Sequence, residues 1–264
     1  MPRNAWLTID DTPTADTNAL LDALLADNIP ALLFIRGARA QERPDEVRRA
    51  IRDGFTIGNH SWNHLRSSEI SLETVLDEID RTEDLIHQFY QQENTPRGNK
   101  YFRFPHMDRG MAGYIVDYAQ WPEYEAGLSR AFREGLNVKL PVLDNAMRDK
   151  AAALQEALKT RGYKSLPAET VTLDWYKNTD VAQAIDAMYT FSTNDWMLTN
   201  RHKGKHAWKT LQDLKDKIDV DPDLQRSDTG HIILMHDDED GLLEVTLALL
   251  AHFKLRNFQF QKFD

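Results

Sequence analysis

The feature that most constrains the fold is a series of short apolar runs alternating with helical patterns. The run from Ile29 to Ile35 is apolar at almost every position, as expected for a strand buried on both faces in a parallel sheet. Helical spacing of apolar residues over 18–25 precedes it, and a polar helix over 41–53 follows. Because parallel strands need crossover connections, this pattern predicts an α/β fold.

The alternation continues along the chain. Further strands are expected over 5–9, 55–58, 100–104, 188–192, 231–235 and 258–263, with strand-like sequence over 163–175, and further helices over 71–90, 145–161, 180–187, 207–218 and 241–253. Repeated β-α units imply right-handed crossovers and a barrel-like sheet. Barrels of this kind can span ~200–250 residues as a single domain. We therefore expect a single domain over 1–264. The aromatic and glycine-containing segment over about 107–145 breaks the pattern and is interpreted as an insertion over the barrel mouth.

Composition excludes several classes of partner. The formal charge of −10, from 32 Lys+Arg against 42 Asp+Glu, gives no basic surface for nucleic acid or anionic lipid. No stretch of ~18 apolar residues predicts a membrane span. The chain has no cysteine, so any metal must be bound by histidine and carboxylate.

The N-terminus does not predict a compartment. Met1-Pro2-Arg3 leads directly into the first expected strand, without the charged, apolar and small-residue regions of a secretory signal. This fits either a cytoplasmic protein or an exported chain whose leader has been removed. The oligomeric state is not predicted.

Two adjacent carboxylates end the first expected strand. Asp10 and Asp11 follow Ile9 and precede Thr12-Pro13. On a regular strand they would point to opposite sides, so within one pocket one could bind a metal while the other acts as a base. An aspartate before Thr-Pro is also an ordinary turn or cap residue, so the pair needs support from other stretches.

A histidine pair follows the third expected strand. His60 and His64 are four positions apart, so on a helical turn they would face the same way and could chelate one ion. With Asp11 they would form a set of two histidines and one carboxylate that leaves positions open for water and substrate. His202 and His206 have the same spacing, but basic residues flank them, and that pair is interpreted as a solvated loop.

Two further strand ends carry polar groups. Arg103 lies at the end of the fourth expected strand, and His236 follows the strand over 231–235. Alone, Arg103 could be a surface ion pair and His236 a cap or core residue. Together with the carboxylates and the histidine pair, they predict one site at the carboxyl ends of the strands.

At this level of detail the chain resembles the polysaccharide deacetylase family, which removes N-acetyl and sometimes O-acetyl groups from chitin, peptidoglycan and related glycans. The matching stretches are Thr8-Ile9-Asp10-Asp11, His60-Ser61-Trp62-Asn63-His64, Arg103-Phe104-Pro105-His106 and Leu234-Met235-His236. Their order and strand placement agree with the family from residue 5 to about 260. The resemblance implies a distorted (β/α)7 barrel of the polysaccharide deacetylase type, here with an insertion over its mouth.

The resemblance also implies a ligand set and a cofactor. Asp11, His60 and His64 would hold one divalent metal, expected to be zinc, with cobalt, nickel or manganese as alternatives. The implied partner is an N-acetylated saccharide substrate.

The remaining roles are implied in the same way. Asp10 would be the general base that activates water, and Arg103 would pair with it and orient it. His236 would be the acid that protonates the departing amine. The backbone N–H of His106 would donate to the tetrahedral oxyanion. Amide hydrolysis independently requires an activated water, a stabilised oxyanion and a proton for a poor leaving group.

The aspartate that supports the catalytic histidine has two candidates. Asp174 lies in Thr172-Leu173-Asp174-Trp175, after a Gly-Tyr pair as in the family. Asp195 lies before Trp196 and is separated from His236 by a single expected helix. Asp195 is favoured because an extra β-α unit would push Asp174 away from His236, while Asp174 remains the alternative.

Two departures bear on the substrate. His106 replaces the usual aromatic residue, and the insertion is longer than the family's single helix. Four aromatic residues there could be sugar platforms or packing residues: Tyr114, Tyr118, Trp121 and Tyr124. The sequence thus predicts a single catalytic domain that hydrolyses an N-acetyl group on a saccharide and releases acetate. The alternatives are an amidohydrolase or deformylase acting on a non-polysaccharide amide, and a glycan-binding module without turnover.

Overall fold

The computed structural model describes residues 2–111, 116–136, 142–238 and 241–263. Its strands are β1 (Arg3–Thr12), β2 (Ala31–Ile35), β3 (Thr56–Asn59), β4 (Phe191–Ser192), β5 (His231–His236) and β6 (Phe258–Phe260). Its helices are α1 (Thr17–Ala26), α2 (Gly37–Glu42), α3 (Pro44–Arg52), α4 (Leu72–Gln92), α5 (Glu125–Phe132), α6 (Asn145–Thr160), α7 (Asp174–Lys177), α8 (Leu211–Val220) and α9 (Leu243–Leu255). The described strands form one parallel sheet in the order β3-β2-β1-β5-β4, with β6 paired to the start of β1.

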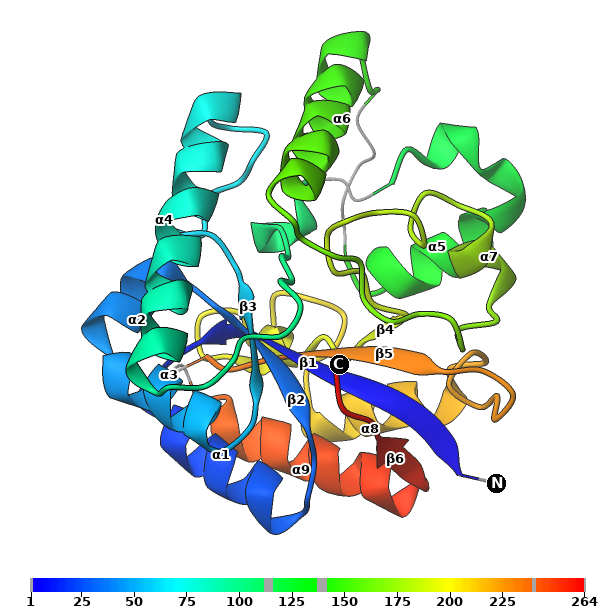
Figure 1. Cartoon of the computed structure of the whole chain (residues 1–264). Helices are drawn as coiled ribbons and strands as arrows, with labels where there is room; N and C mark the ends of the chain where they lie inside the picture. The colour runs from blue at the N-terminus through cyan, green and yellow to red at the C-terminus, as the bar shows by residue number, and fades with distance from the viewer. Residues whose placement is uncertain (1, 112–115, 137–141, 239–240, 264) are drawn as a thin grey trace.

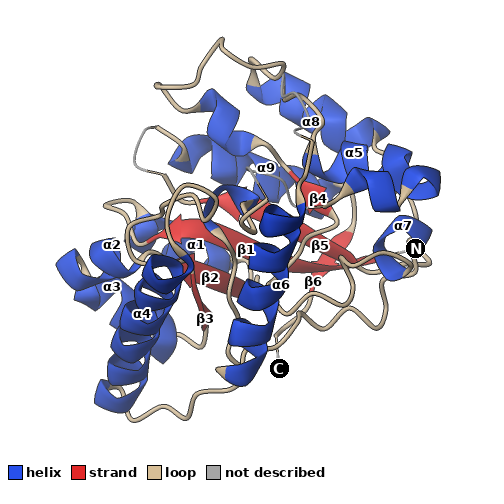
Figure 2. Ribbon diagram, turned by 90° about the horizontal axis from the view of Figure 1, so that it is seen from above, coloured by secondary structure: helices blue, strands red, loops and turns tan. Residues whose placement is uncertain are grey.

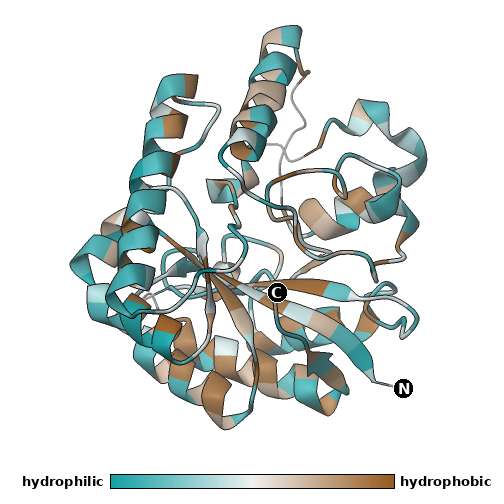
Figure 3. Ribbon diagram, viewed as in Figure 1, coloured by the Kyte–Doolittle hydropathy of each residue, from teal (hydrophilic) through white to brown (hydrophobic). Residues whose placement is uncertain are grey.

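The strand β1 is the centre of this sheet. Leu7 pairs with Ala31 of β2 on one side and with Ile233 of β5 on the other. Ala5, Leu7 and Ile9 have no exposed surface, as the parallel-sheet prediction requires. Figure 3 shows the apolar colouring of the strands at the centre of the molecule and the polar outer faces of the helices.

Alternate residues of the central strands face two different apolar clusters. Ala5, Leu7 and Ile9 pack with residues of α1, α3 and α9. Leu32 and Phe34 belong instead to a cluster formed with the insertion and the segment 166–189. In Figure 1, α1, α8 and α9 lie on one side of the sheet, and α5, α6 and α7 lie on the other, while α4 lies beside the β3 edge of the sheet. Figure 2 shows the same sheet between helices from above.

The fold prediction is confirmed: this is a parallel α/β barrel, and it is strongly distorted. The described sheet is not closed by regular pairing between β3 and β4. Isolated hydrogen bonds outside the regular ladders bridge this gap: Asn59 N donates to Tyr101 O at 2.8 Å, and Ala187 N donates to Phe102 O at 2.6 Å. Thr190 N then donates to Ile232 O of β5 at 2.9 Å. The expected strand over 100–104 therefore contributes bridges to its neighbours and no ladder.

Several expected elements are wrong in detail. The helix over 41–53 is two helices, α2 and α3, because Pro44 lacks the N–H needed inside a helix and begins a new one. The helix over 207–218 begins only at Leu211, where Thr210 and Asp213 form a capping box. Residues 180–187 form turns, and the strand-like stretch over 163–175 gives one bridge at Tyr163 followed by α7.

The described part of the insertion packs on the face of the sheet that carries Leu32 and Phe34. Leu128 and Phe132 of α5 belong to the same apolar cluster as Phe34, and Trp121 and Tyr124 pack against that cluster. Tyr114 lies outside the described residues. The division into one domain with an insertion over 107–145 stays a prediction. Among the described helices, none has the length and apolarity that crossing a membrane would require.

A glycine on β3 sets the packing beneath the site. A Cβ on Gly58 would lie 2.6 Å from the ring of Phe34, whose centroid is 4.4 Å from the guanidinium carbon of Arg103. We expect Gly58→Ala to lower the free energy of unfolding by ~1–3 kcal/mol, the cost of overpacking a core. Urea denaturation measures this, with Thr56→Ala at the start of the same strand as the control. A stability equal to that of the wild type would contradict it.

Candidate active site

A bulge at the end of β1 brings both carboxylates to the same cavity. The pairing of β1 with β2 shifts register between Ile9 and Thr12, and Asp11 has a left-handed φ of 70°. This conformation breaks the strict alternation of side chains. Asp10 and Asp11 both line one cavity of about 660 Å³, as separate roles within one pocket require.

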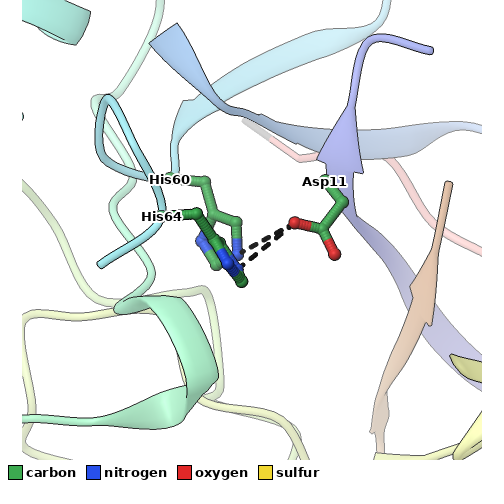
Figure 4. A group of neighbouring side chains, drawn as sticks. All are labelled: Asp11, His60 and His64. Atoms are coloured by element: carbon green, nitrogen blue, oxygen red, sulfur yellow. Dashed lines mark ion pairs between the residues drawn. The ribbon is translucent and has the colours of Figure 1, made fainter. Parts of the chain in front are cut away.

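Asp11, His60 and His64 form a candidate metal centre. Their ligand atoms all lie within 4.8 Å of one another, and among the described residues this is the one such group. Asp11 Oδ1 is 3.3 Å from His64 Nε2 and 4.0 Å from His60 Nε2. Figure 4 shows the carboxylate facing both imidazoles. These separations suit one ion with ligand bonds of about 2.0–2.2 Å.

The protonation chemistry of this group also fits a cation. Burial lowers the pKa of His60 and the pKa of His64, which favours the neutral imidazole that binds metals. Burial raises the pKa of Asp11, but the charges of His64, His60 and His236 outweigh it and hold that pKa well below its usual range. Asp11 Oδ1 is buried and has no hydrogen-bond partner, and a bound cation would satisfy it.

A structured loop holds the two histidines. Residues 60–64 are not helical, contrary to the expected helical turn, and Ser61 and His64 have left-handed φ angles of 66° and 61°. Glu78 of α4 accepts from Ser61 Oγ at 2.9 Å, from Asn63 N at 2.6 Å and from Asn63 Nδ2 at 2.5 Å. His60 Nδ1 lies 2.8 Å from the backbone O of Arg103, which directs Nε2 toward Asp11.

Glu78 is a residue of the site that was not predicted from the sequence. It is only 4% exposed although it carries a charge. The available signal was an acidic residue on the apolar stripe of α4, between Val75 and Ile79. A charged side chain in such a position is buried and needs partners, which the loop of metal ligands supplies.

Arg103 is fully buried and paired with Asp10. Its Nη1 donates to Asp10 Oδ1 at 2.7 Å and to Thr8 Oγ1 at 2.9 Å, while its Nε donates to Ala187 O at 2.9 Å. The guanidinium therefore fixes the carboxylate from behind. Asp10 Oδ2 is 3.7 Å from His60 Nε2, so the carboxylate also borders the metal ligands.

His236 meets Asp195 and not Asp174. His236 Nδ1 lies 2.7 Å from Asp195 Oδ1, and its backbone N donates to Asp195 Oδ2 at 2.8 Å. Asp10 is the register partner of His236 on β1. Asp174 instead begins α7 and is exposed. Burial lowers the pKa of His236, but the charge and hydrogen bond of Asp195, with the charges of Asp10 and Asp11, raise it to about 9.

His106 lines the cavity beside His64. It follows Pro105 with a left-handed φ of 54°, and its ring centroid is 4.4 Å from that of His64. Burial and the charge of Arg66 lower the pKa of His106 to about 4, so the ring is neutral. Tyr118 also lines the cavity.

The second histidine pair is part of the cavity wall, which corrects its interpretation as a solvated loop. His202 and His206 both line the cavity. Their ring centroids lie 5.1 and 4.8 Å from that of Trp196, the residue after Asp195. Arg201 beside them pairs with Asp238. The basic flanking residues suggested solvent, whereas packing on an indole required the tertiary structure.

Comparison with known proteins shows a class of proteins to which this chain is similar. Residues 2–113 match the family model described as polysaccharide deacetylase. An uncharacterized 30.6 kDa protein of Geobacillus stearothermophilus is 29% identical over 177 residues, which are 60% of this chain and 65% of that protein. The peptidoglycan-N-acetylmuramic acid deacetylase PdaC of Bacillus subtilis is 37% identical over 83 residues, 31% of this chain and 18% of that protein. The chain thus spans less than two thirds of these relatives.

Solved structures extend the likeness over almost the whole chain. The polysaccharide deacetylase Bc1974 of Bacillus cereus has a TM-score of 0.58 at 18% identity, covering 99% of this chain and 92% of that one. A pseudoenzyme of the same fold, BA3943 of Bacillus anthracis, has a TM-score of 0.55 at 15% identity, covering 98% and 63%. At these identities the likeness establishes the fold alone. With the family match over residues 2–113 and the motifs, the chain is similar to the polysaccharide deacetylase family.

The ligand set can be tested with one histidine inside the cluster and one outside it. We expect His64→Ala to abolish stoichiometric binding of a divalent metal, because two ligands are too few to retain the ion. His206→Ala, which alters a histidine of the same cavity, should leave binding intact. Elemental analysis after zinc loading and gel filtration measures both. Full metal content in His64→Ala would rule out the site.

The pairing of His236 with Asp195 predicts a pH effect. A raised pKa keeps the imidazolium protonated to higher pH, so removing the carboxylate charge should shift the loss of activity at alkaline pH toward neutrality. We expect Asp195→Asn to move this basic limb of the pH–rate profile to lower pH. Asp174→Asn should leave it unchanged, and a shift confined to Asp174→Asn would reverse the assignment.

Proposed function

We propose that this protein hydrolyses the N-acetyl group of a saccharide or glycan to release acetate and a free amine, using a divalent metal that is expected to be zinc. The proposal rests on one observation: two ion pairs lie next to the candidate metal ligands. Asp10 is held by Arg103, and His236 is held by Asp195. A base and an acid thus border the same three ligands.

The roles follow from the state of each group. A divalent metal held by Asp11, His60 and His64 would polarise the acetyl carbonyl and increase the acidity of water. Asp10 accepts the proton of the attacking water, and the guanidinium of Arg103 orients its carboxylate. The attack forms a tetrahedral centre, toward which the backbone N–H of His106 donates.

Collapse of that centre requires an acid. The C–N bond breaks, and the nitrogen takes a proton from the His236 imidazolium as it leaves as an amine. Asp195 favours this protonated form, consistent with the raised pKa of His236, about 9. The atoms balance as amide plus water giving acetate plus amine.

An N-acetylated saccharide is the substrate class best supported by relatives. Two partial matches are a peptidoglycan-N-acetylmuramic acid deacetylase and a chitooligosaccharide deacetylase. The alternative function is a glycan-binding module without turnover, because a pseudoenzyme with the same fold is known. The complete set of Asp10, Arg103, His236 and the metal ligands favours an enzyme, because each is needed for turnover and none for glycan packing.

The proposal is tested with a panel of N-acetylated and N-formylated saccharides and small amides, scored for acetate and formate. We expect acetate from the saccharides and a fall of ~10²–10⁴-fold in kcat for Asp10→Asn, the scale of general acid–base catalysis, with metal content unchanged. Asp174→Asn is the matched control at an exposed aspartate. Turnover of small amides alone would support the amidohydrolase reading, and glycan binding without turnover the binding module.

A further inference from the structure

A buried lysine lies behind the turn that carries Asp195. Lys217 is in the last turn of α8 and is only 4% exposed. Lysine is almost never buried to this extent unless its ammonium is paired. Its Nζ donates to the backbone O of Ser192 at 2.8 Å and to Asn194 Oδ1. The proposed chemistry assigns no role to this cation.

The surroundings of Lys217 show that the ammonium is held in place on every side. Its Nζ lies 4.7 Å from the ring centroid of Phe191 and 5.7 Å from that of Trp208. Glu134 Oε2 is 3.6 Å away. Burial lowers the pKa of Lys217, which the charges of Glu134 and Asp221 partly offset, leaving it at about 8. An apolar side chain could pack between these rings but could not satisfy the Ser192 carbonyl.

The two contacts of Lys217 fix both ends of a tight turn. Asn194 adopts a left-handed conformation with φ 56° and ψ 25°, which Asn tolerates better than most residues. The backbone N of Asn194 is also fixed, because it donates a hydrogen bond to Ser192 Oγ at 3.2 Å. The next residue is Asp195, which is fully buried and hydrogen-bonded to the backbone N and the ring Nδ1 of His236.

Lys217 and the reacting groups lie on opposite sides of this turn. Ser192 and Asn194 line the catalytic cavity, whereas Lys217 lines a second cavity of about 390 Å³. The lysine therefore acts on the site through the turn and not through contact with a substrate. We propose that Lys217 is a positioning residue of the active site, which locks the Ser192–Asn194 turn so that Asp195 holds His236 in its working orientation. This inference rests on the proposed function.

A double-mutant cycle tests this route of action. If Lys217 acts through Asp195, its removal should matter only while Asp195 can hold His236. We expect Lys217→Met to lower kcat by ~10–100-fold with KM and metal content nearly unchanged, but to lower it by less than about threefold in the Asp195→Asn background. Equal losses in the two backgrounds, or no loss in the first, would overturn the inference.

Control variants separate positioning from stability. Lys215→Met changes a half-buried lysine of the same helix and should keep wild-type kcat.

The chain has no cysteine, so Lys217→Cys can be aminoethylated at a single site while unfolded and then refolded. Restored kcat would support a role for the ammonium, and a folded, metal-loaded product without recovery would refute it. If Lys217→Met does not fold, Asn194→Gly keeps the left-handed turn, removes the acceptor and should show the same loss of kcat.

A spectroscopic readout separates this inference from the proposed function. The proton between His236 Nδ1 and Asp195 can be followed by NMR without any substrate. We expect its resonance to shift or broaden in Lys217→Met and to stay in place in Lys215→Met. An unchanged resonance would overturn the inference even if the enzyme is active. A wild type without turnover would refute the function, whereas a shifted resonance would still support the positioning role.

Discussion

The buried guanidinium of Arg103 joins parts of the barrel that have no regular pairing. It donates to Asp10 and Thr8 on β1 and to Ala187 in the irregular segment that precedes β4. The ring of Phe34 on β2 lies beneath it. A charge taken out of water is tolerated only when it is paired and hydrogen-bonded. Those requirements draw β1, β2 and the irregular segment to a common point, where the site is built.

The same requirement recurs on the helices around the sheet. Glu78 on α4 and Lys217 on α8 are charged residues on otherwise apolar stripes, and both are nearly fully buried. Each finds its partners in a loop at the carboxyl end of a strand. Glu78 holds the loop of His60 and His64, and Lys217 holds the turn before Asp195. Helix packing thereby transmits a fixed geometry to loops that would otherwise have few constraints.

The catalytic cavity combines groups whose charges depend on one another. Burial alone would favour neutral forms of Asp11 and His236. The charges of His64, His60 and His236 shift the pKa of Asp11 down. The charge and hydrogen bond of Asp195, with the charges of Asp10 and Asp11, shift the pKa of His236 up. The result is an ionised ligand and a protonated acid in one enclosed space, which is the separation of roles that amide hydrolysis needs. The pattern belongs to the assembled site and to none of its residues alone.

The sequence by itself determined the parallel α/β class, the resemblance to a family and the strand ends at which the polar groups gather. These follow from local periodicity and from residue types at fixed spacings, which neighbouring residues largely decide. Tertiary structure decided the rest: the bulge that turns Asp11 into the cavity, the choice of Asp195 over Asp174, and the packing of His202 and His206 on Trp196. Each depends on contacts between segments far apart in the chain, and such contacts leave no periodic signal in the sequence.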